Sequence, residues 1–204
     1  MKFTLLDNGA DSLKGVYESL DKFDNRVSDS YHHIKDAVIF LNHGIEILFK
    51  VILSNHSTAL MFTEIKSYQE AKVKMKKSGK SNVFEVNSDL KTVSLIEAMN
   101  RIEFLCDIEI PELLRNSIYF INKTRNQIMH FGIELSEKDV GELVKKLKYC
   151  HEESILFLEK HIDDLSETIE DSRFEYTRED YEIDMGEWQA ELMMEEAKLE
   201  SYDD

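Results

Sequence analysis

Apolar residues recur along this chain at intervals of three and four, the spacing that places them on one face of an α-helix. The strongest pattern covers residues 30–54, where Ile34, Val38, Leu41 and Ile45 follow one another by single helical turns. The segments with helical spacing predict these helices: residues 9–26, 30–54, 60–75, 93–105, 111–130 and 136–165. Alternation of period two, which is typical of strands, does not occur over a useful length.

Turn and cap residues divide these segments. Pro111 fits the first turn of a helix, and Gly132 fits a left-handed C-cap. Ser136 and Asp139 have the spacing of a capping box. Residues 78–89 predict a loop that contains a short extended piece at Val83–Val86. With one proline and seven glycines in 204 residues, the chain predicts an all-α fold, an up-and-down bundle of four to five main helices.

The charge divides the chain into a body and a tail. The formal net charge is −16, but residues 163–204 hold 17 acidic and three basic residues, whereas residues 1–162 hold 24 acidic and 22 basic residues. We therefore expect a helical domain at residues 1–165 and an acidic extension at residues 166–204, partly helical or disordered, with one candidate helix at residues 187–199. A solvated tail is the first interpretation. A tail that competes with RNA for the body is the second.

A dense basic run lies within the nearly neutral body. Its members are Lys72, Lys74, Lys76, Lys77 and Lys80. Such a run is most often a solvated helix face or loop. As a functional alternative, the lysines would contact RNA phosphates, because an ammonium group supplies charge without sequence preference.

Several classes of protein are not expected. Cys106 and Cys150 are too few and too far apart for a disulfide framework or a zinc knuckle, and we find no residue pattern for a metal or another cofactor. The N-terminal residues lack the apolar segment of a secretory signal, and no window suggests the roughly 20 apolar residues of a membrane-spanning helix. We expect a cytoplasmic protein without a membrane partner.

The most informative chemistry lies at the end of the segment Pro111–Gly132. Its apolar stripe runs through Leu114, Ile118, Ile121 and Ile128. Arg125 falls on or beside this stripe, and a buried guanidinium needs a carboxylate, a phosphate or a crevice. Asn126 and His130 share a face, whereas Arg125 and His130 are about 140° apart around an ideal helix. They can converge only if the last turn unwinds or if a second copy of the helix faces the first.

An arginine and a histidine suit cleavage of RNA without metal. Histidine can move the proton of the 2′-hydroxyl or of the leaving 5′ oxygen, and arginine can stabilise the charge that builds on the phosphate. The 2′-hydroxyl is the nucleophile, so RNA but not DNA would be cut. From spacing alone, a structural salt bridge of Arg125 is the preferred interpretation.

The segment Arg125-Asn126-Gln127-Ile128-Met129-His130 resembles the R-N-x-x-x-H signature of the HEPN superfamily. The preceding segments Leu41–Lys50 and Lys91–Leu95 resemble its helical context, and the similarity covers roughly residues 10–160. The resemblance implies a helical bundle and a metal-independent endoribonuclease, of the kind found in toxin–antitoxin and antiphage defence systems. It also implies a homodimer with Arg125 and His130 of both chains in one cleft.

The resemblance further implies roles for two supporting residues. Asn126 would orient the histidine, and Glu46 would hold Arg125, although an ion pair of Glu46 with Lys50 is about equally expected. Members controlled by a nucleotidyltransferase antitoxin carry a tyrosine two residues after the histidine, where this chain has Gly132. The implied partners are therefore RNA and possible antitoxin or other proteins.

Two other functions stay open on the sequence. One is a non-catalytic HEPN-fold module that binds a nucleotide or a protein. The other is a plain helical interaction protein whose acidic tail binds a basic partner.

Overall fold

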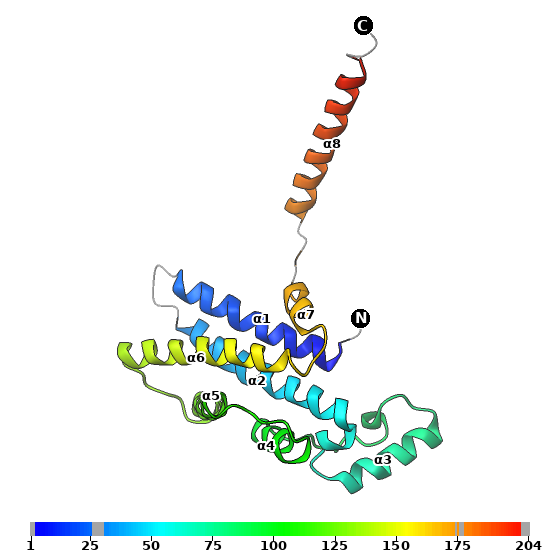
Figure 1. Ribbon diagram of the computed structural model, residues 1–204, viewed down its shortest axis with the longest axis vertical. Helices are drawn as coiled ribbons and strands as arrows, with labels where there is room; N and C mark the ends of the chain where they lie inside the picture. Colours follow the sequence, from blue (N-terminus) through cyan, green and yellow to red (C-terminus); the bar gives the residue numbers. More distant parts are fainter. Residues whose placement is uncertain (1–2, 26–30, 174, 176–177, 201–204) are drawn as a thin grey trace. The chain divides into compact units, whose positions relative to one another are not determined.

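The computed structural model describes residues 3–25, 31–173, 175 and 178–200. The fold is all-α (Figure 1), which confirms the expectation from the sequence. The long helices are α1 (Leu5–Asp24), α2 (His32–His56), α3 (Ile65–Ser78), α4 (Leu95–Leu105), α5 (Glu112–His130), α6 (Glu137–Leu158) and α8 (Arg178–Glu200). Shorter elements are α7 (Leu165–Asp171) and the 3-10 turns η1 (Thr58–Met61) and η2 (Val83–Glu85).

Local capping explains where several helices begin. The Thr4 hydroxyl accepts a hydrogen bond from the Asp7 N–H at 3.1 Å, and the Asp7 carboxylate accepts one from the Thr4 N–H at 2.9 Å. Ser136 and Asp139 form the same reciprocal pair before α6, as the sequence predicts. These side chains satisfy N–H groups that lack a partner inside the helix.

Helix α2 is the centre of the body, because α1, α4, α5 and α6 all pack against it. It lies alongside α1 (Figure 1), and two glycines allow the close approach. A Cβ atom at Gly9 would lie 2.5 Å from Leu48 Cγ, and one at Gly44 would lie 3.1 Å from Leu13 Cδ2. A side chain at Gly9 would therefore force Leu48 to shift, and one at Gly44 would require Leu13 to move by a few tenths of an ångström.

By length and composition, α2 is apolar enough to cross a membrane. The expectation that no segment reaches this threshold is therefore wrong. Most of the helix is nevertheless buried against its neighbours, as Leu41, Ile45 and Leu48 illustrate with no exposed surface. A core helix of this kind passes the same test as a membrane span, so the pattern is weak evidence for a membrane.

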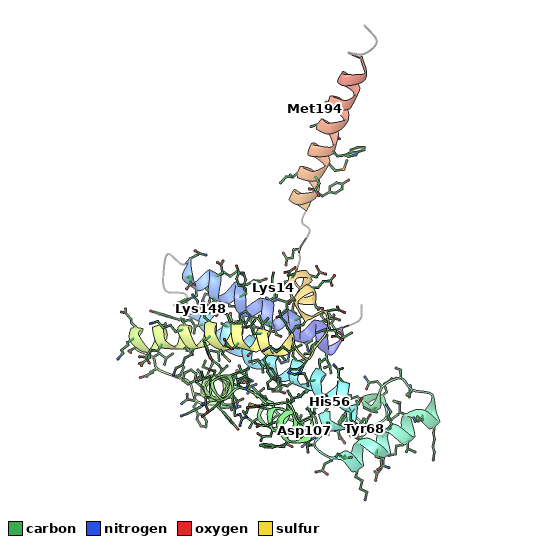
Figure 2. All side chains as sticks on the ribbon, viewed as in Figure 1. Lys14, His56, Tyr68, Asp107, Lys148 and Met194 are labelled. Atoms are coloured by element: carbon green, nitrogen blue, oxygen red, sulfur yellow. The ribbon has the colours of Figure 1, made fainter. Side chains whose placement is uncertain are left out.

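The segment around α3 forms a small cluster of its own. The Phe62 ring stacks on Tyr68 at a centroid distance of 4.5 Å, and Tyr68 is labelled on α3 in Figure 2. Arg101 of α4 ties this cluster to the body, because its Nη1 donates to the carbonyl oxygens of Leu60 and Phe62, each at 2.8 Å. The prediction of an extended piece at Val83–Val86 is wrong, because residues Val83–Glu85 form the 3-10 turn η2.

The C-terminal part differs from the predicted boundaries. Helix α6 ends at Leu158 rather than near Leu165, and Asp164 has a left-handed φ of 59° before α7 begins. Leu165 is buried and α7 packs on α1, so one compact unit extends through Ser172. The second unit begins at Arg173 and contains α8, a longer helix than the predicted residues 187–199.

Candidate functional site

Helix α5 carries the Arg125 motif. Leu114, Ile118, Ile121 and Thr124 are buried on its inner face. The buried Thr124 hydroxyl donates a hydrogen bond to the Phe120 carbonyl oxygen at 3.0 Å. Arg125 follows directly and is half-buried at the margin of this face. The guanidinium is therefore held close to the body without being enclosed by it.

Asn126 is the hydrogen-bond partner of Arg125. Arg125 Nη1 donates to Asn126 Oδ1 at 3.1 Å, and the Asn126 side chain is exposed. The resemblance assigns Asn126 to the histidine, but the observed contact is with the arginine. The amide therefore orients the guanidinium, and it leaves the other guanidinium N–H groups to contact a ligand.

His130 is the last residue of α5 and is exposed. The chain leaves the helix through Phe131 and then Gly132, whose φ of 77° confirms the predicted left-handed position. Because α5 remains helical through His130, its last turn does not unwind to bring His130 round to Arg125. The structure therefore does not bring these two side chains together within one protomer.

Glu46 lies on α2, and its carboxylate pairs with Lys50. Lys50 Nζ lies 2.7 Å from Glu46 Oε1, and the two side chains are 7% and 30% exposed. This is the alternative that the sequence left open. Among the described residues, no ion pair joins Glu46 to Arg125. The nearly buried Lys50 ammonium group and the partly exposed Glu46 carboxylate therefore form an ion pair on this part of α2.

His43 belongs to the same part of α2 and was not singled out from the sequence. Its Nε2 lies 3.3 Å from Asn8 Oδ1 on α1, and part of its ring is exposed. Burial of the remainder lowers the pKa of His43, and the positive charges of Lys50 and Arg125 lower it further, whereas the carboxylates of Glu46 and Asp11 oppose this. Arg125 is thus near enough for its charge to act on His43.

The histidine could have been found from its position three residues before Glu46, which places both on neighbouring turns of one helix face. Its contact with Asn8, however, depends on the packing of α1 on α2. These contacts define a polar cluster from two helices, Asn8 on α1 and His43, Glu46 and Lys50 on α2, and the charge of Arg125 on α5 acts on the pKa of His43.

The basic run lies elsewhere. Lys72, Lys74, Lys76 and Lys77 belong to α3, and Lys80 follows Gly79, whose φ of 66° ends the helix. All except the half-buried Lys72 are exposed. Figure 1 shows α3 apart from α5, on the other side of α4, so the basic run lies in another part of the body than the Arg125 motif. Lys72 Nζ lies 5.9 Å from the centroid of the Tyr68 ring, and Lys80 Nζ lies 3.8 Å from Glu85 Oε2.

A pocket of about 440 Å³ adjoins the end of α5. Its apolar lining comes from α2, from α5 and the segment after it, and from α6, and includes Ile34, Ile128, Ile133, Leu135, Val140 and Leu143. Tyr31 and Lys35 add polar groups. Within the described ranges, no group of three or more His, Cys, Asp or Glu side chains is arranged to hold a metal ion.

Comparison of the chain with protein-family models, with curated proteins and with solved structures gave no match. The likeness to the HEPN superfamily therefore depends on the motif from Arg125 to His130 and on its helical context.

Proposed function

We propose that this protein is a metal-independent endoribonuclease that acts as a homodimer, in the role of a toxin or an antiphage defence effector. The observation that carries the proposal is the half-buried Arg125, whose guanidinium is held by Asn126 at the margin of the buried face of α5. An arginine held in this way binds and neutralises a phosphodiester better than a freely rotating one.

The chemistry needs no protein nucleophile. The ribose 2′-hydroxyl attacks its own phosphorus, the bond from phosphorus to the 5′ oxygen breaks, and a cyclic 2′,3′-phosphate forms. Arg125 stabilises the charge on the phosphate oxygens during this step. His130 exchanges a proton with one of the two reacting oxygens.

The shape of α5 supports the homodimer in this proposal. Arg125 and His130 diverge around an intact helix, so one protomer does not present both to one phosphate. A two-fold arrangement of two α5 helices supplies Arg125 from one protomer and His130 from its partner. The exposed Tyr119, Met129 and Phe131 give this part of the molecule apolar surface that a partner copy would cover.

The lysines of α3 have a secondary role in the proposal. They lie on α3, apart from α5 (Figure 1), so they would contact other phosphates of the same RNA than the one that is cleaved. Contacts of this kind raise affinity without sequence preference and weaken as salt rises. The proposal also places the protein in the cytoplasm, with an antitoxin or another protein as a possible regulatory partner.

The second candidate is a non-catalytic module that binds a nucleotide or a protein. The pocket at the end of α5 favours it, because an apolar cavity of about 440 Å³ with a few polar groups is typical of ligand sites. In that case Arg125 and His130 would hold a phosphate without cleaving it.

Cleavage of RNA in EDTA separates these candidates. We expect the wild-type protein to cut RNA, and Arg125→Ala and His130→Ala each to abolish cutting while helicity is retained. Lys145→Ala, which removes an exposed cation from α6, serves as the matched control and should cut normally. Binding of RNA without cleavage by the wild-type protein would favour the second candidate.

A further inference from the structure

Another cavity, of about 280 Å³, runs along α3 and is called here the α3 groove. Its apolar lining consists of Ala59 of η1 and of Ile65, Tyr68 and Val73 of α3. Its polar lining consists of Gln69, Lys72 and Lys76, all from α3. Helix α3 packs mainly on η1 and η2, and Ile65 and Val73 remain 55% and 47% exposed. The α3 groove is therefore open to a binding partner.

The base of the α3 groove is held in place by the packing beneath it. Tyr68 is buried, and its ring stacks on Phe62 at a centroid distance of 4.5 Å and an interplanar angle of 20°. Arg101 fixes the backbone on this side through the carbonyl oxygens of Leu60 and Phe62. A ligand would thus meet a surface that is already formed, which lowers the entropy cost of binding.

The charge around the α3 groove is strongly positive. Residues 65–80 contain six lysines and one glutamate. In the part of the chain that the structure describes, Lys80 pairs with Glu85 at 3.8 Å, whereas Lys72 and Lys76 form no ion pair. Lys72 Nζ lies 5.9 Å from the centroid of the Tyr68 ring, so its charge is held at the groove. Apolar surface beside unpaired cations is complementary to a ligand that has an apolar part and negative charges.

The size of the α3 groove separates the two polyanions that would match this charge. An acidic helix docks through several apolar side chains at intervals of three and four residues, so it needs a long groove. A volume of about 280 Å³ lies just below the range of roughly 300–1,000 Å³ that is typical of pockets for drug-sized ligands. One planar nucleobase suits this volume better than a row of side chains does.

We propose that the α3 groove is an RNA-binding subsite that takes one unpaired base, with Lys72 and Lys76 on the phosphates that flank it. The choice of RNA rests on the proposed ribonuclease function. The base packs on Ile65 and Val73, and the Gln69 amide both donates to and accepts from its edge. Lys72 and Lys76 are one helical turn apart, about 6 Å along the axis, a spacing similar to that of neighbouring phosphates in an extended strand. A duplex would keep the phosphate contacts but would lose the base contact.

The first test separates the α3 groove from general attraction by lysines. Fluorescence anisotropy measures binding of the full-length protein to a 2′-O-methyl RNA of about 12 nucleotides, which lacks the nucleophile and stays intact. Lys72→Gln with Lys76→Gln removes two charges at the groove, and Lys74→Gln with Lys77→Gln removes two exposed charges of α3 outside its lining. We expect affinity to fall roughly tenfold or more in the first pair and about two- to threefold in the second. Equal losses would overturn the inference.

The second test concerns the base. Val73→Gln removes apolar surface without a change in charge, and Ile65→Gln is a second variant of the same kind. We expect each to lower affinity for the single strand roughly threefold, with the salt dependence unchanged, and to leave the weaker binding of the matching duplex as it was. Circular dichroism checks that each variant is folded. Wild-type affinity in both folded variants would overturn the inference, and so would a wild-type protein that binds the duplex as tightly as the single strand.

Two further outcomes separate this inference from other assignments. Tighter binding of a polyglutamate peptide than of the RNA at equal salt would assign the α3 groove to an acidic protein segment and overturn the inference. A protein that shows the expected binding but cuts no RNA in EDTA would overturn the ribonuclease proposal and leave the RNA-binding subsite standing. A protein that cuts RNA while the groove variants bind like the wild type would overturn the subsite alone.

Discussion

Removal of the Glu46 carboxylate tests how the polar cluster is held together. The Lys50 side chain is 7% exposed, and its Nζ lies 2.7 Å from Glu46 Oε1. An exposed pair one helical turn apart contributes about 0.3–0.5 kcal/mol, whereas removing one partner from a fully buried pair costs about 3–5 kcal/mol. Because Glu46 is 30% exposed and Lys50 is nearly enclosed, we expect Glu46→Gln to lower the free energy of unfolding by about 1–2 kcal/mol.

A double-mutant cycle shows whether the stabilisation by Glu46 comes from its interaction with Lys50 or with Arg125. Urea unfolding of Glu46→Gln, Lys50→Met and the double variant should give a coupling of about 1 kcal/mol, with unchanged m values. The matching cycle of Glu46→Gln with Arg125→Gln should give less than about 0.5 kcal/mol. A larger coupling of Glu46 to Arg125 than to Lys50 would refute this account and restore the role that the HEPN resemblance implies for Glu46.

Three further predictions concern packing, assembly and the tail. Gly9→Ala should destabilise the protein by about 1–3 kcal/mol in thermal or urea unfolding, because the new methyl group meets Leu48. Gly141→Ala on α6 meets nothing within 4 Å and should instead stabilise by about 0.5–1 kcal/mol, and equal effects would contradict the packing argument. Light scattering at micromolar concentration should show a homodimer, and a monomer that retains full activity would exclude the two-fold site. Truncation after Ser172 should raise RNA affinity severalfold at low salt and less at high salt if the tail competes with RNA; unchanged affinity would leave it a solvated appendage.

Local patterns predicted which segments are helical but not every boundary, since α1 begins at Leu5 rather than at residue 9 and α3 begins at Ile65 rather than at residue 60. The caps Thr4, Ser94 and Ser136 act on N–H groups within three residues, so the sequence carries most of what decides where α1, α4 and α6 begin. The prediction of an extended piece at Val83–Val86 was wrong for a local reason as well. Asn82 and Glu85 form a reciprocal cap, which closes these residues into a 3-10 turn.

The candidate site was only partly predictable. Arg125, Asn126 and His130 follow from the sequence of one helix, and Glu46–Lys50 is a pair one turn apart on another. The link from His43 to Asn8 spans 35 residues and exists only because α1 packs closely on α2. The lysines of α3 illustrate the opposite case: a run that is dense in sequence lies apart from α5 (Figure 1), because α3 packs on η1 and η2.

The chemical nature of the RNA ends tests the central claim most directly. A single RNA oligonucleotide is incubated with the protein in EDTA, and the products are identified by mass spectrometry. Attack by the 2′-hydroxyl predicts fragments that end in a 2′,3′-cyclic phosphate and fragments that begin with a 5′-hydroxyl, with neither formed by Arg125→Ala. Products with a 3′-hydroxyl and a 5′-phosphate, or cleavage that appears only after a divalent metal is added, would contradict the account.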